Sequence, residues 1–426
     1  MRSKSDKKKP LVPRLRFPEF REAGAWEVKE LGEIASISNG LTADQSGDSN
    51  GLKVTRIETI SEGCIDISKV GYIDRIEGVE RFGLRIGDIL FSHINSQSHI
   101  GKTALVEEDF DLYHGMNLLR LQVDKTENNP RFTYYLLNTE FFRKSVQARS
   151  NQAVNQASIN QTEVGNSQIA VPSAKEQQKI AHCLSSLDEV IGLQAKKVQA
   201  LKRHKKGLMQ QLFPAEGETT TPRLRFPEFR EAGAWEVRRL GEIGKISKGK
   251  GISKSDIKPN GALPCIRYGE LYTHYGEVIR DVVSFTDANP GNLVLSEEND
   301  VIIPASGETK EDIATASCVS VKGVALGGDL NIFYSPMNGM FLAYYIRGNL
   351  KFEISKVAQG NSVVHLYTTQ LEKLKLAVPP YPKEQQKIAH CLSSLDEVIG
   401  LESDKLDALK NLKKGLMQQL FPQEVA

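Results

Sequence analysis

A long segment with a heptad pattern occurs twice in this chain of 426 residues. It runs from Lys175 to Pro214 and returns, largely unchanged, from Lys383 to Pro422. Its apolar residues are spaced alternately by four and three positions, which is the period that lets one helix pack along another. A helix with charged flanks cannot bury such a stripe alone, and each large aliphatic side chain left in water forgoes roughly 1.5–3 kcal/mol. We therefore expect each copy to form one long helix that needs a partner helix.

The apolar stripes of the two copies match at an offset of 208 residues. The predicted coiled-coil contacts are Ile180, Leu184, Leu187, Ile191 and Leu201 in the first copy, and Ile388, Leu392, Leu395, Ile399 and Leu409 in the second. Polar residues interrupt the stripes at Gln194 and Lys205, and at Glu402 and Lys413, where they either set the register or extend to solvent. The nearest available partner is the other copy, so we expect an antiparallel pair of pseudo-two-fold equivalents. The alternative is that each helix covers a globular core by itself.

A second repeat precedes each variable part of the chain. It spans Pro13–Ile34 and Pro222–Ile243, and twenty of its twenty-two positions are identical. Each copy contains one of the two tryptophans of the chain, Trp26 or Trp235. The Pro-rich opening followed by Trp predicts an extended leader with an aromatic anchor, which leads into a short helix or strand. The chain thus consists of two units, each with a leader, an insert and a long helix.

The two inserts, Ala35–Ala174 and Gly244–Pro382, differ from each other in sequence. Weak correspondences nevertheless predict one fold for both, because each has a turn before a buried strand and an aromatic amphipathic helix, at Arg131–Lys144 or Met340–Lys351. We expect an α+β chain in which each insert is a small mixed α/β domain with a largely antiparallel sheet. Near-identical frames that hold unlike inserts favour a modular reader, since a duplicated enzyme would keep matching catalytic residues in both inserts.

Composition limits the location and the partners of the chain. The net charge is only +2, so a surface for nucleic acid has to be local. Five single cysteines make neither a disulfide framework nor a metal site. The basic start lacks a following apolar segment, and no window approaches eighteen apolar residues. We expect a cytoplasmic protein without a membrane partner.

No set of catalytic residues is evident. Gly101-Lys102-Thr103 resembles the end of a phosphate-binding loop, but Ser96 stands where that loop requires glycine, so a β-turn with a basic tip is expected. The pair His182-Cys183, which is repeated at His390-Cys391, cannot act as base and nucleophile because adjacent helical residues point about 100° apart. We expect no catalytic residue and no metal ligand in this chain.

Polar and basic side chains gather in loops that suit the reading of DNA. The main loops are Ser92–His99 and Ser150–Gln161 in the first insert, and Lys245–Lys254, Ser306–Glu311 and Gly360–His365 in the second. Asn and Gln bond adenine bidentately, Lys and Arg bond guanine, and spaced lysines suit phosphates. The candidate DNA-binding residues are Arg56, His93, Asn95, Ser96, Gln97, Lys102, Asn155, Lys248, Lys250, Lys254, Arg267, Tyr268, Ser306, Thr309, Lys310 and His365. For any single one of them, a solvated loop is the alternative.

The layout resembles the specificity subunit of type I restriction-modification enzymes. The residues that carry the resemblance are Val171-Pro172 followed by Lys175–Ile180, and Val378-Pro379 followed by Lys383–Ile388. They place a proline before Glu-Gln-x-x-Ile at the start of each long helix, and the resemblance covers nearly the whole chain.

The resemblance implies a DNA-recognition subunit that is not an enzyme. Each insert would read one half of a bipartite, asymmetric site in double-stranded DNA, and the helices would fix the gap. The partners implied are two methyltransferase subunits, which use S-adenosylmethionine, and restriction/translocase subunits, which use ATP and Mg; this chain would hold no cofactor. The alternative from another class is a coiled-coil scaffold whose two inserts bind protein or another ligand.

The resemblance also names the domains. The expected boundaries are a disordered basic tail at 1–12, a first target-recognition domain with its leader at 13–174, a central spacer helix at 175–213, a second target-recognition domain with its leader at 214–382, and a C-terminal spacer helix at 383–421.

Overall fold

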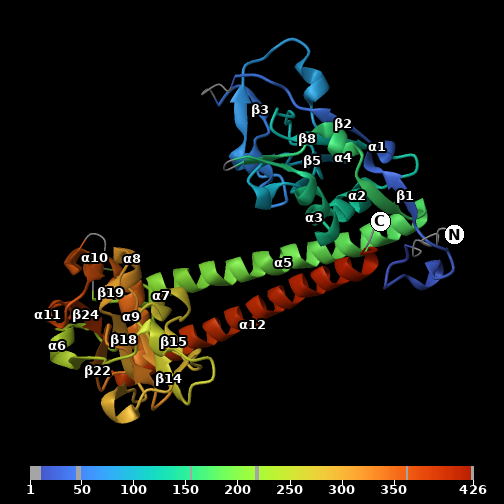
Figure 1. Cartoon of the computed structure of the whole chain (residues 1–426). Coiled ribbons are helices and arrows are strands. Elements are labelled where there is room, and N and C mark those ends of the chain that lie inside the picture. The colour runs from blue at the N-terminus through green and yellow to red at the C-terminus, as the bar shows by residue number, and fades with distance from the viewer. Residues whose placement is uncertain (1–10, 45–48, 154–155, 216–219, 361–362, 424–426) are drawn as a thin grey trace, which may run out of the picture. The chain divides into compact units, whose positions relative to one another are not determined.

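The structure is a computed structural model that describes residues 11–44, 49–153, 156–215, 220–360 and 363–423. The chain divides into two compact units, Met1–Leu193 with Lys405–Ala426 as unit 1 and Gln194–Asp404 as unit 2. Two helices have 39 residues each, α5 (Ala174–Leu212) and α12 (Pro382–Leu420) (Figure 1). Each of them has one part in unit 1 and the other part in unit 2. Of the predicted tail, residues 1–10 lie outside the described residues. Leu11 belongs to the fold, because its carbonyl accepts a hydrogen bond from the Trp26 N–H at 2.8 Å.

Unit 1 is built on a four-stranded antiparallel sheet in the order β2-β8-β5-β7. The strands are β1 Glu27–Glu30, β2 Ala35–Asn39, β3 Leu52–Val54, β4 Gly71–Ile73, β5 Asp88–Phe91, β6 Ile94–Asn95, β7 Thr103–Leu105, β8 Leu119–Val123, β9 Asn151–Ala153, β10 Gln156–Ser158 and β11 Gln168–Val171. The helices of the insert and its leader are α1 Leu31–Ile34, α2 Pro130–Leu137, α3 Glu140–Arg149 and α4 Gln161–Gly165. The leader strand β1 pairs with β11, the strand just before α5.

Unit 2 has a five-stranded sheet in the order β13-β22-β18-β20-β15, antiparallel except between β15 and β20. Its strands are β12 Glu236–Arg239, β13 Lys245–Lys248, β14 Leu263–Ile266, β15 Val278–Ile279, β16 Ser284–Thr286, β17 Val294–Leu295, β18 Asp300–Pro304, β19 Ser306–Gly307, β20 Ser317–Val319, β21 Ala325–Leu326, β22 Leu330–Tyr334, β23 Val364–His365 and β24 Lys375–Val378. Its helices are α6 Leu240–Ile243, α7 Glu270–Thr273, α8 Lys310–Ile313, α9 Gly339–Asn349, α10 Lys351–Val357 and α11 Thr368–Leu371. Again the leader strand, β12, pairs with the strand that precedes a long helix, β24.

The predicted aromatic helix Arg131–Lys144 is broken in two, whereas the predicted helix Met340–Lys351 coincides almost wholly with α9. The segment Arg131–Lys144 contains nearly all of α2 and the start of α3. The two helices are separate because Thr139 is extended and its hydroxyl caps the N–H of Phe142 at 3.3 Å. The corresponding helices α9 and α10 meet at Leu350. In both units these helices cover the sheet, and Phe132 or Phe341 is fully buried beneath them.

The parts of α5 and α12 that share a unit run antiparallel. In unit 1, Asp188 of α5 contacts Lys413 of α12, while Trp26 beside the start of α5 packs against Phe421 beyond the end of α12. In unit 2, Lys205 of α5 contacts Asp396 of α12. None of the predicted seam residues is exposed. At the helix ends, however, Ile180, Leu184, Ile388 and Leu392 belong to the cores of the inserts, so there the helices also cover a globular core.

Candidate nucleic-acid interface

In unit 1 the fold brings two of the predicted polar loops together. Strand β6, within the Ser92–His99 loop, pairs antiparallel with β10, within the Ser150–Gln161 run, so that Asn95 lies opposite Ala157. Strand β10 also pairs with β9, which gives a small three-stranded sheet at the edge of the domain. Asn155 and residue 154 lie outside the described residues.

Asn95 ends strand β6, and Ser96 and Gln97 follow it at the start of a 3-10 helix, Gln97–His99. Asn95 is half-buried; its amide donates to Ser92 Oγ at 3.3 Å, and its carbonyl oxygen accepts from the Ser96 N–H at 2.8 Å. Ser96 is exposed, and its hydroxyl lies 2.8 Å from Nδ1 of His99. Gln97 is held by α3, because its amide donates to the Gln147 carbonyl at 2.8 Å. The loop is thus ordered by its own side chains.

His93 lies beneath this loop rather than on its surface. Only 7% of it is exposed, and its Nδ1 is 3.3 Å from the Ile159 carbonyl. Burial lowers the pKa of His93, and burial also lowers the pKa of His114, to about 4. The buried imidazole of His93 supports the loop from below. Its position therefore does not favour the prediction that His93 contacts DNA.

The remaining candidates of unit 1 occupy separate positions. Arg56 follows strand β3 and stands exposed at the start of a 3-10 helix, Ile57–Ile60, 3.8 Å from Glu58. Lys102 lies in the expected turn, where Gly101 has a φ of 80°, and its ammonium group donates to the Ser61 carbonyl at 2.7 Å. Among the described residues, the side-chain hydrogen bonds and ion pairs of Arg56 and Lys102 do not involve Asn95 or Gln97.

In unit 2 the corresponding pairing joins two of the three predicted loops, Ser306–Glu311 and Gly360–His365. Strand β19 pairs with β23, and Ser306 lies opposite His365. The Ser306 hydroxyl is 3.2 Å from Nδ1 of His365 and 3.5 Å from Oδ1 of Asp329. Thr309 and Lys310 are exposed at the start of α8, which Thr309 caps through the Asp312 N–H at 3.1 Å. Residues 361–362 of the loop Gly360–His365 lie outside the described residues.

The basic candidates of unit 2 lie along a neighbouring loop. Lys248, Lys250 and Lys254 are exposed, and the Lys250 N–H donates to the Leu326 carbonyl at 2.9 Å. Although Lys248 is exposed, partial desolvation of its ammonium group lowers its pKa, while the charge of Asp329 raises it. Asp329 therefore lies near both the Ser306 pair and the lysine loop, and sequence reasoning did not single it out.

Arg267 and Tyr268 stand at the end of strand β14. Arg267 is half-buried and lies 3.5 Å from Glu270 Oε1. The Ile266 carbonyl accepts from the Gly327 N–H at 2.9 Å, which places these residues beside the segment that also holds Lys250. The backbones of Lys250 and Ile266 thus both pair with the Leu326-Gly327 segment.

The leaders contribute a clamp that sequence reasoning missed. Arg16 makes two hydrogen bonds to the Glu176 carboxylate, at 2.8 and 2.7 Å, and Trp26 Nε1 donates to the same group at 3.3 Å. Glu176 and Arg16 are both buried. The second unit repeats the arrangement with Arg225, Trp235 and Glu384 at matching positions. The glutamate of each Glu-Gln motif therefore fastens a leader to the start of a long helix.

The glutamine of the motif makes a second set of contacts. Gln177 accepts a hydrogen bond from the Asn129 N–H at 2.9 Å and donates to the Pro172 carbonyl at 3.0 Å. Gln385 accepts from the Asn338 N–H at 3.1 Å. Asn129 and Asn338 cap α2 and α9, so each glutamine connects a long helix to the helix that covers the sheet.

A tyrosine, an aspartate and a lysine tie each insert to both long helices. In unit 1, Tyr135 donates to Asp188 Oδ2 at 2.7 Å, and Lys413 lies 2.6 Å from Oδ1 of the same aspartate. In unit 2, Tyr344 donates to Asp396 at 2.5 Å and Lys205 lies 2.6 Å from it. Burial raises the pKa of both tyrosines, and the aspartates raise it further. The lysines at the polar stripe positions thus each contact a half-buried aspartate of the other long helix.

With this geometry known, comparison with known proteins shows the family. A model of the type I restriction modification DNA specificity domain matches residues 24–203 and again residues 233–411. The chain is 34% identical over 404 residues to the putative type I restriction enzyme MjaX specificity subunit of Methanocaldococcus jannaschii, covering 93% of this chain and 92% of that protein. It is 24% identical over 420 residues to the MjaIX specificity subunit of the same organism, again covering 93% and 92%. The chain belongs to the type I restriction-modification DNA specificity family and contains two copies of its domain.

Two solved structures share the fold. One is the S subunit of a type I restriction-modification system from M. genitalium, with a TM-score of 0.64, 16% identity and coverage of 97% of this chain and 100% of that chain. The other is a chain from a structural study of complex assembly in the type I system, with a TM-score of 0.53, 18% identity and coverage of 94% and 98%. Within the described residues, no helix combines the length and the apolar character needed to cross a bilayer.

Proposed function

We propose that this chain is the DNA-recognition subunit of a type I restriction-modification enzyme, in which each unit reads one half of a bipartite, asymmetric site. The observation that carries the proposal is that one fold presents different side chains at equivalent places. Strand β6 pairs with β10 in unit 1, β19 pairs with β23 in unit 2, and the residues on the two pairs differ. Two units that share a leader and a long helix but differ in the residues of these strand pairs suit a DNA site whose two halves differ in sequence.

The chemistry of each surface suits base edges. In unit 1, Asn95 and Gln97 carry amides that can bond adenine in the major groove. In unit 2, the exposed His365 and Asp329 can bond cytosine and Lys310 can bond guanine, while the buried Ser306 contacts His365. The three exposed lysines of the 248–254 loop would contact phosphates, which position the protein without reading sequence.

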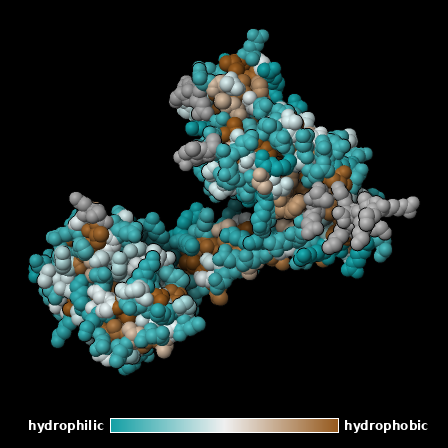
Figure 2. Space-filling view, viewed as in Figure 1, coloured by the Kyte–Doolittle hydropathy of each residue, from teal (hydrophilic) through white to brown (hydrophobic). Residues whose placement is uncertain are grey.

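The long helices would fix the gap between the half-sites and bind the methyltransferase subunits. Exposed apolar residues favour partner helices: Val190 and Leu193 on α5 are 47% and 67% exposed, and their equivalents Val398 and Leu401 on α12 are 42% and 70% exposed. Figure 2 shows apolar side chains among the hydrophilic ones over the long helices. A large aliphatic side chain gains roughly 1.5–3 kcal/mol from burial, so such positions suit an interface.

In this proposal the chain itself performs no chemistry. S-adenosylmethionine would bind to the two methyltransferase subunits, and ATP and Mg to restriction/translocase subunits in the complete enzyme. The complex would act on double-stranded DNA in the cytoplasm. The leader clamps and the Tyr–Asp–Lys contacts would hold each reading surface in a fixed orientation to its helix.

The proposal is tested by adenine methylation. Purified chain is mixed with the methyltransferase subunits of its own system, S-adenosylmethionine and genomic DNA, and methylated adenines are mapped by sequencing. We expect methylation confined to one motif of two unlike halves with a constant gap. The methyltransferase subunits alone are the control and should leave the DNA unmodified. Absence of sequence-specific methylation in the complete mixture would favour a scaffold that binds no DNA.

A further inference from the structure

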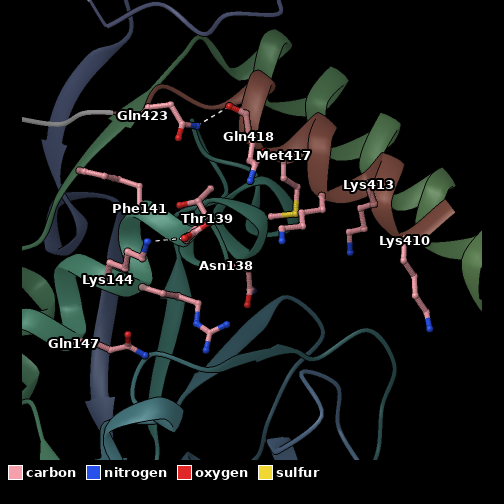
Figure 3. A pocket seen from close by; sticks show the side chains of 13 residues that line it. Asn138, Thr139, Phe141, Lys144, Gln147, Lys410, Lys413, Met417, Gln418 and Gln423 are labelled. Atoms are coloured by element: carbon pink, nitrogen blue, oxygen red, sulfur yellow. Dashed lines mark hydrogen bonds and ion pairs between the residues drawn. The ribbon is translucent and has the colours of Figure 1, made fainter. Parts of the chain in front are cut away.

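Unit 1 contains a cavity of about 480 Å³ between α3 and the last turns of α12. Figure 3 shows Lys413 and Met417 extending from α12, and Lys144 and Gln147 from α3, around this space. Five basic side chains line it, Arg143, Lys144, Lys410, Lys413 and Lys414, and Glu140 is its one lining carboxylate. The whole chain carries a net charge of only +2, so this concentration of positive charge is local.

Only part of this charge is neutralised within the unit. Lys413 contacts Asp188 at 2.6 Å and Lys144 contacts Glu140 at 2.6 Å. Lys410 lies 3.7 Å from the exposed Asp407. Among the described residues, Lys414 makes no ion pair within 4 Å, although it lies near enough to Glu140 to lower the pKa of that carboxyl. Lys410 and Lys414 are therefore available to an anion.

The cavity adjoins the reading loop of unit 1 through helix α3. Gln147 lines the cavity, and its carbonyl accepts the hydrogen bond from Gln97 at 2.8 Å. Arg143 also lines the cavity and donates to the Ser98 carbonyl at 3.5 Å. A DNA strand that passes the reading loop would bring its backbone to the same helix.

We propose that this cavity binds phosphates of the DNA backbone beside the half-site that unit 1 reads, with Lys410 and Lys414 as the principal contacts. The inference rests on the proposed function, and it adds a sequence-independent contact from a spacer helix. Flexible lysines suit this task, since an ammonium group is a point charge that tolerates variation in phosphate position. In unit 2, Lys205, the equivalent of Lys413, contacts Glu277 at 2.8 Å as well as Asp396.

The test uses the complex with its methyltransferase subunits and compares Lys410→Gln/Lys414→Gln with wild type. Binding to DNA with and without the target site is measured between 50 and 200 mM KCl. The slope of log K against log salt is negative, and each lost phosphate contact makes it less steep by about 0.9. We therefore expect the slope to become less steep by roughly 1–2 on both DNAs. The methylated sequence should stay the same. Lys405→Gln, on the same helix but outside the cavity, is the matched control and should keep the wild-type slope.

A second measurement locates the phosphates. Uncharged methylphosphonates replace single phosphates along the target; wild type should bind more weakly when they lie beside the half-site of unit 1, and the double variant should be insensitive there. A wild-type salt slope in the double variant would overturn the inference. Loss of the methyltransferase subunits from the complex would also overturn it, because the lysines would then contact protein. Specific methylation by wild type in the same experiment shows that the proposed function holds in either case.

Discussion

Gln194 of α5 donates hydrogen bonds to Glu402 of α12, at 2.7 Å to Oε2 and 2.8 Å to the backbone carbonyl. These are two of the polar residues that interrupt the apolar stripes. Gln194 is only 7% exposed, and Lys197 adds a 2.5 Å contact to Glu402. A buried polar pair in a coiled coil favours one register over others at a cost in stability. We infer that this pair sets the alignment of the two helices.

Replacing the pair by leucines tests that inference. Gln194→Leu/Glu402→Leu should raise the free energy of unfolding by about 1–2 kcal/mol, because a polar pair in a packed seam is commonly less stabilising than an apolar one. It should also relax the register, so that DNA with a gap one base pair longer or shorter becomes methylated. Urea unfolding and methylation of a gap series provide the measurements. Glu189→Leu, at an exposed position of α5, should change neither, and an unaltered gap preference in the double variant would contradict the inference.

Breaking the buried Arg16–Glu176 pair should strongly destabilise unit 1. Arg16→Met leaves Glu176 buried without its cation, which costs about 3–5 kcal/mol. The loss in the free energy of unfolding is measured in a Trp235→Phe background, where Trp26 fluorescence reports the urea unfolding of unit 1. Lys179→Met removes the exposed contact to Glu19 and should cost less than about 1 kcal/mol. Similar losses from both variants would mean that the clamp is not a principal contact.

Acid should destabilise unit 1 through His114. Burial lowers its pKa to about 4 in the folded unit, against 6.5 ordinarily. As the pH falls below 6.5 the unfolded chain binds a proton that the folded unit excludes, so stability decreases down to about pH 4, by roughly 3 kcal/mol at most. Trp26 fluorescence in urea at pH 7 and pH 5 should show this loss, and His114→Gln should reduce it.

Asp300 should give the stability of unit 2 the opposite dependence on pH. Burial raises its pKa from 3.8 to about 6, so between these values the folded unit holds a proton that the unfolded chain releases. Its contribution to stability therefore grows as the pH falls through about 6. The same titration followed by Trp235 in a Trp26→Phe background should show a smaller acid loss than unit 1 shows. Equal pH dependence in the two units would contradict the assignment.

Single reading residues should affect one half-site each. Asn95→Ala should weaken discrimination at one base pair in the half read by unit 1 by about 1–3 kcal/mol and leave the other half unchanged. Lys310→Ala is the matched change in unit 2 and should affect only the other half. Competition with single-base variants of the target measures both. An equal loss across all positions would indicate that Asn95 contacts the backbone instead.

Some of this architecture could be predicted from the sequence because it depends on periodicity. The seam from Ile180 to Leu212 follows from the spacing of apolar residues, and the tryptophan anchors follow from the repeated leader. The break at Thr139 could not be foreseen, since an extended capping threonine looks like any other residue in an amphipathic pattern. Nor could the burial of His93, because a polar residue after a strand fits a surface loop equally well.

The candidate site, too, could be predicted from the sequence only in part. Sequence composition singled out the loops that β6 and β10 join, but their pairing depends on tertiary contacts between residues some sixty positions apart. The Arg16–Glu176 clamp spans 160 positions and has no local pattern. Lys410 and Lys414 were part of a repeated helix, and only the packing of α3 against α12 reveals their cavity.

The central claim is that the two inserts read separate halves of one site. The most direct measurement replaces residues 244–382 by the insert of a relative with a different target, leaves both leaders and both helices in place, and maps methylated adenines with the methyltransferase subunits of this system. We predict that one half of the motif changes to that of the relative, while the other half and the gap persist. A change in both halves would contradict the account.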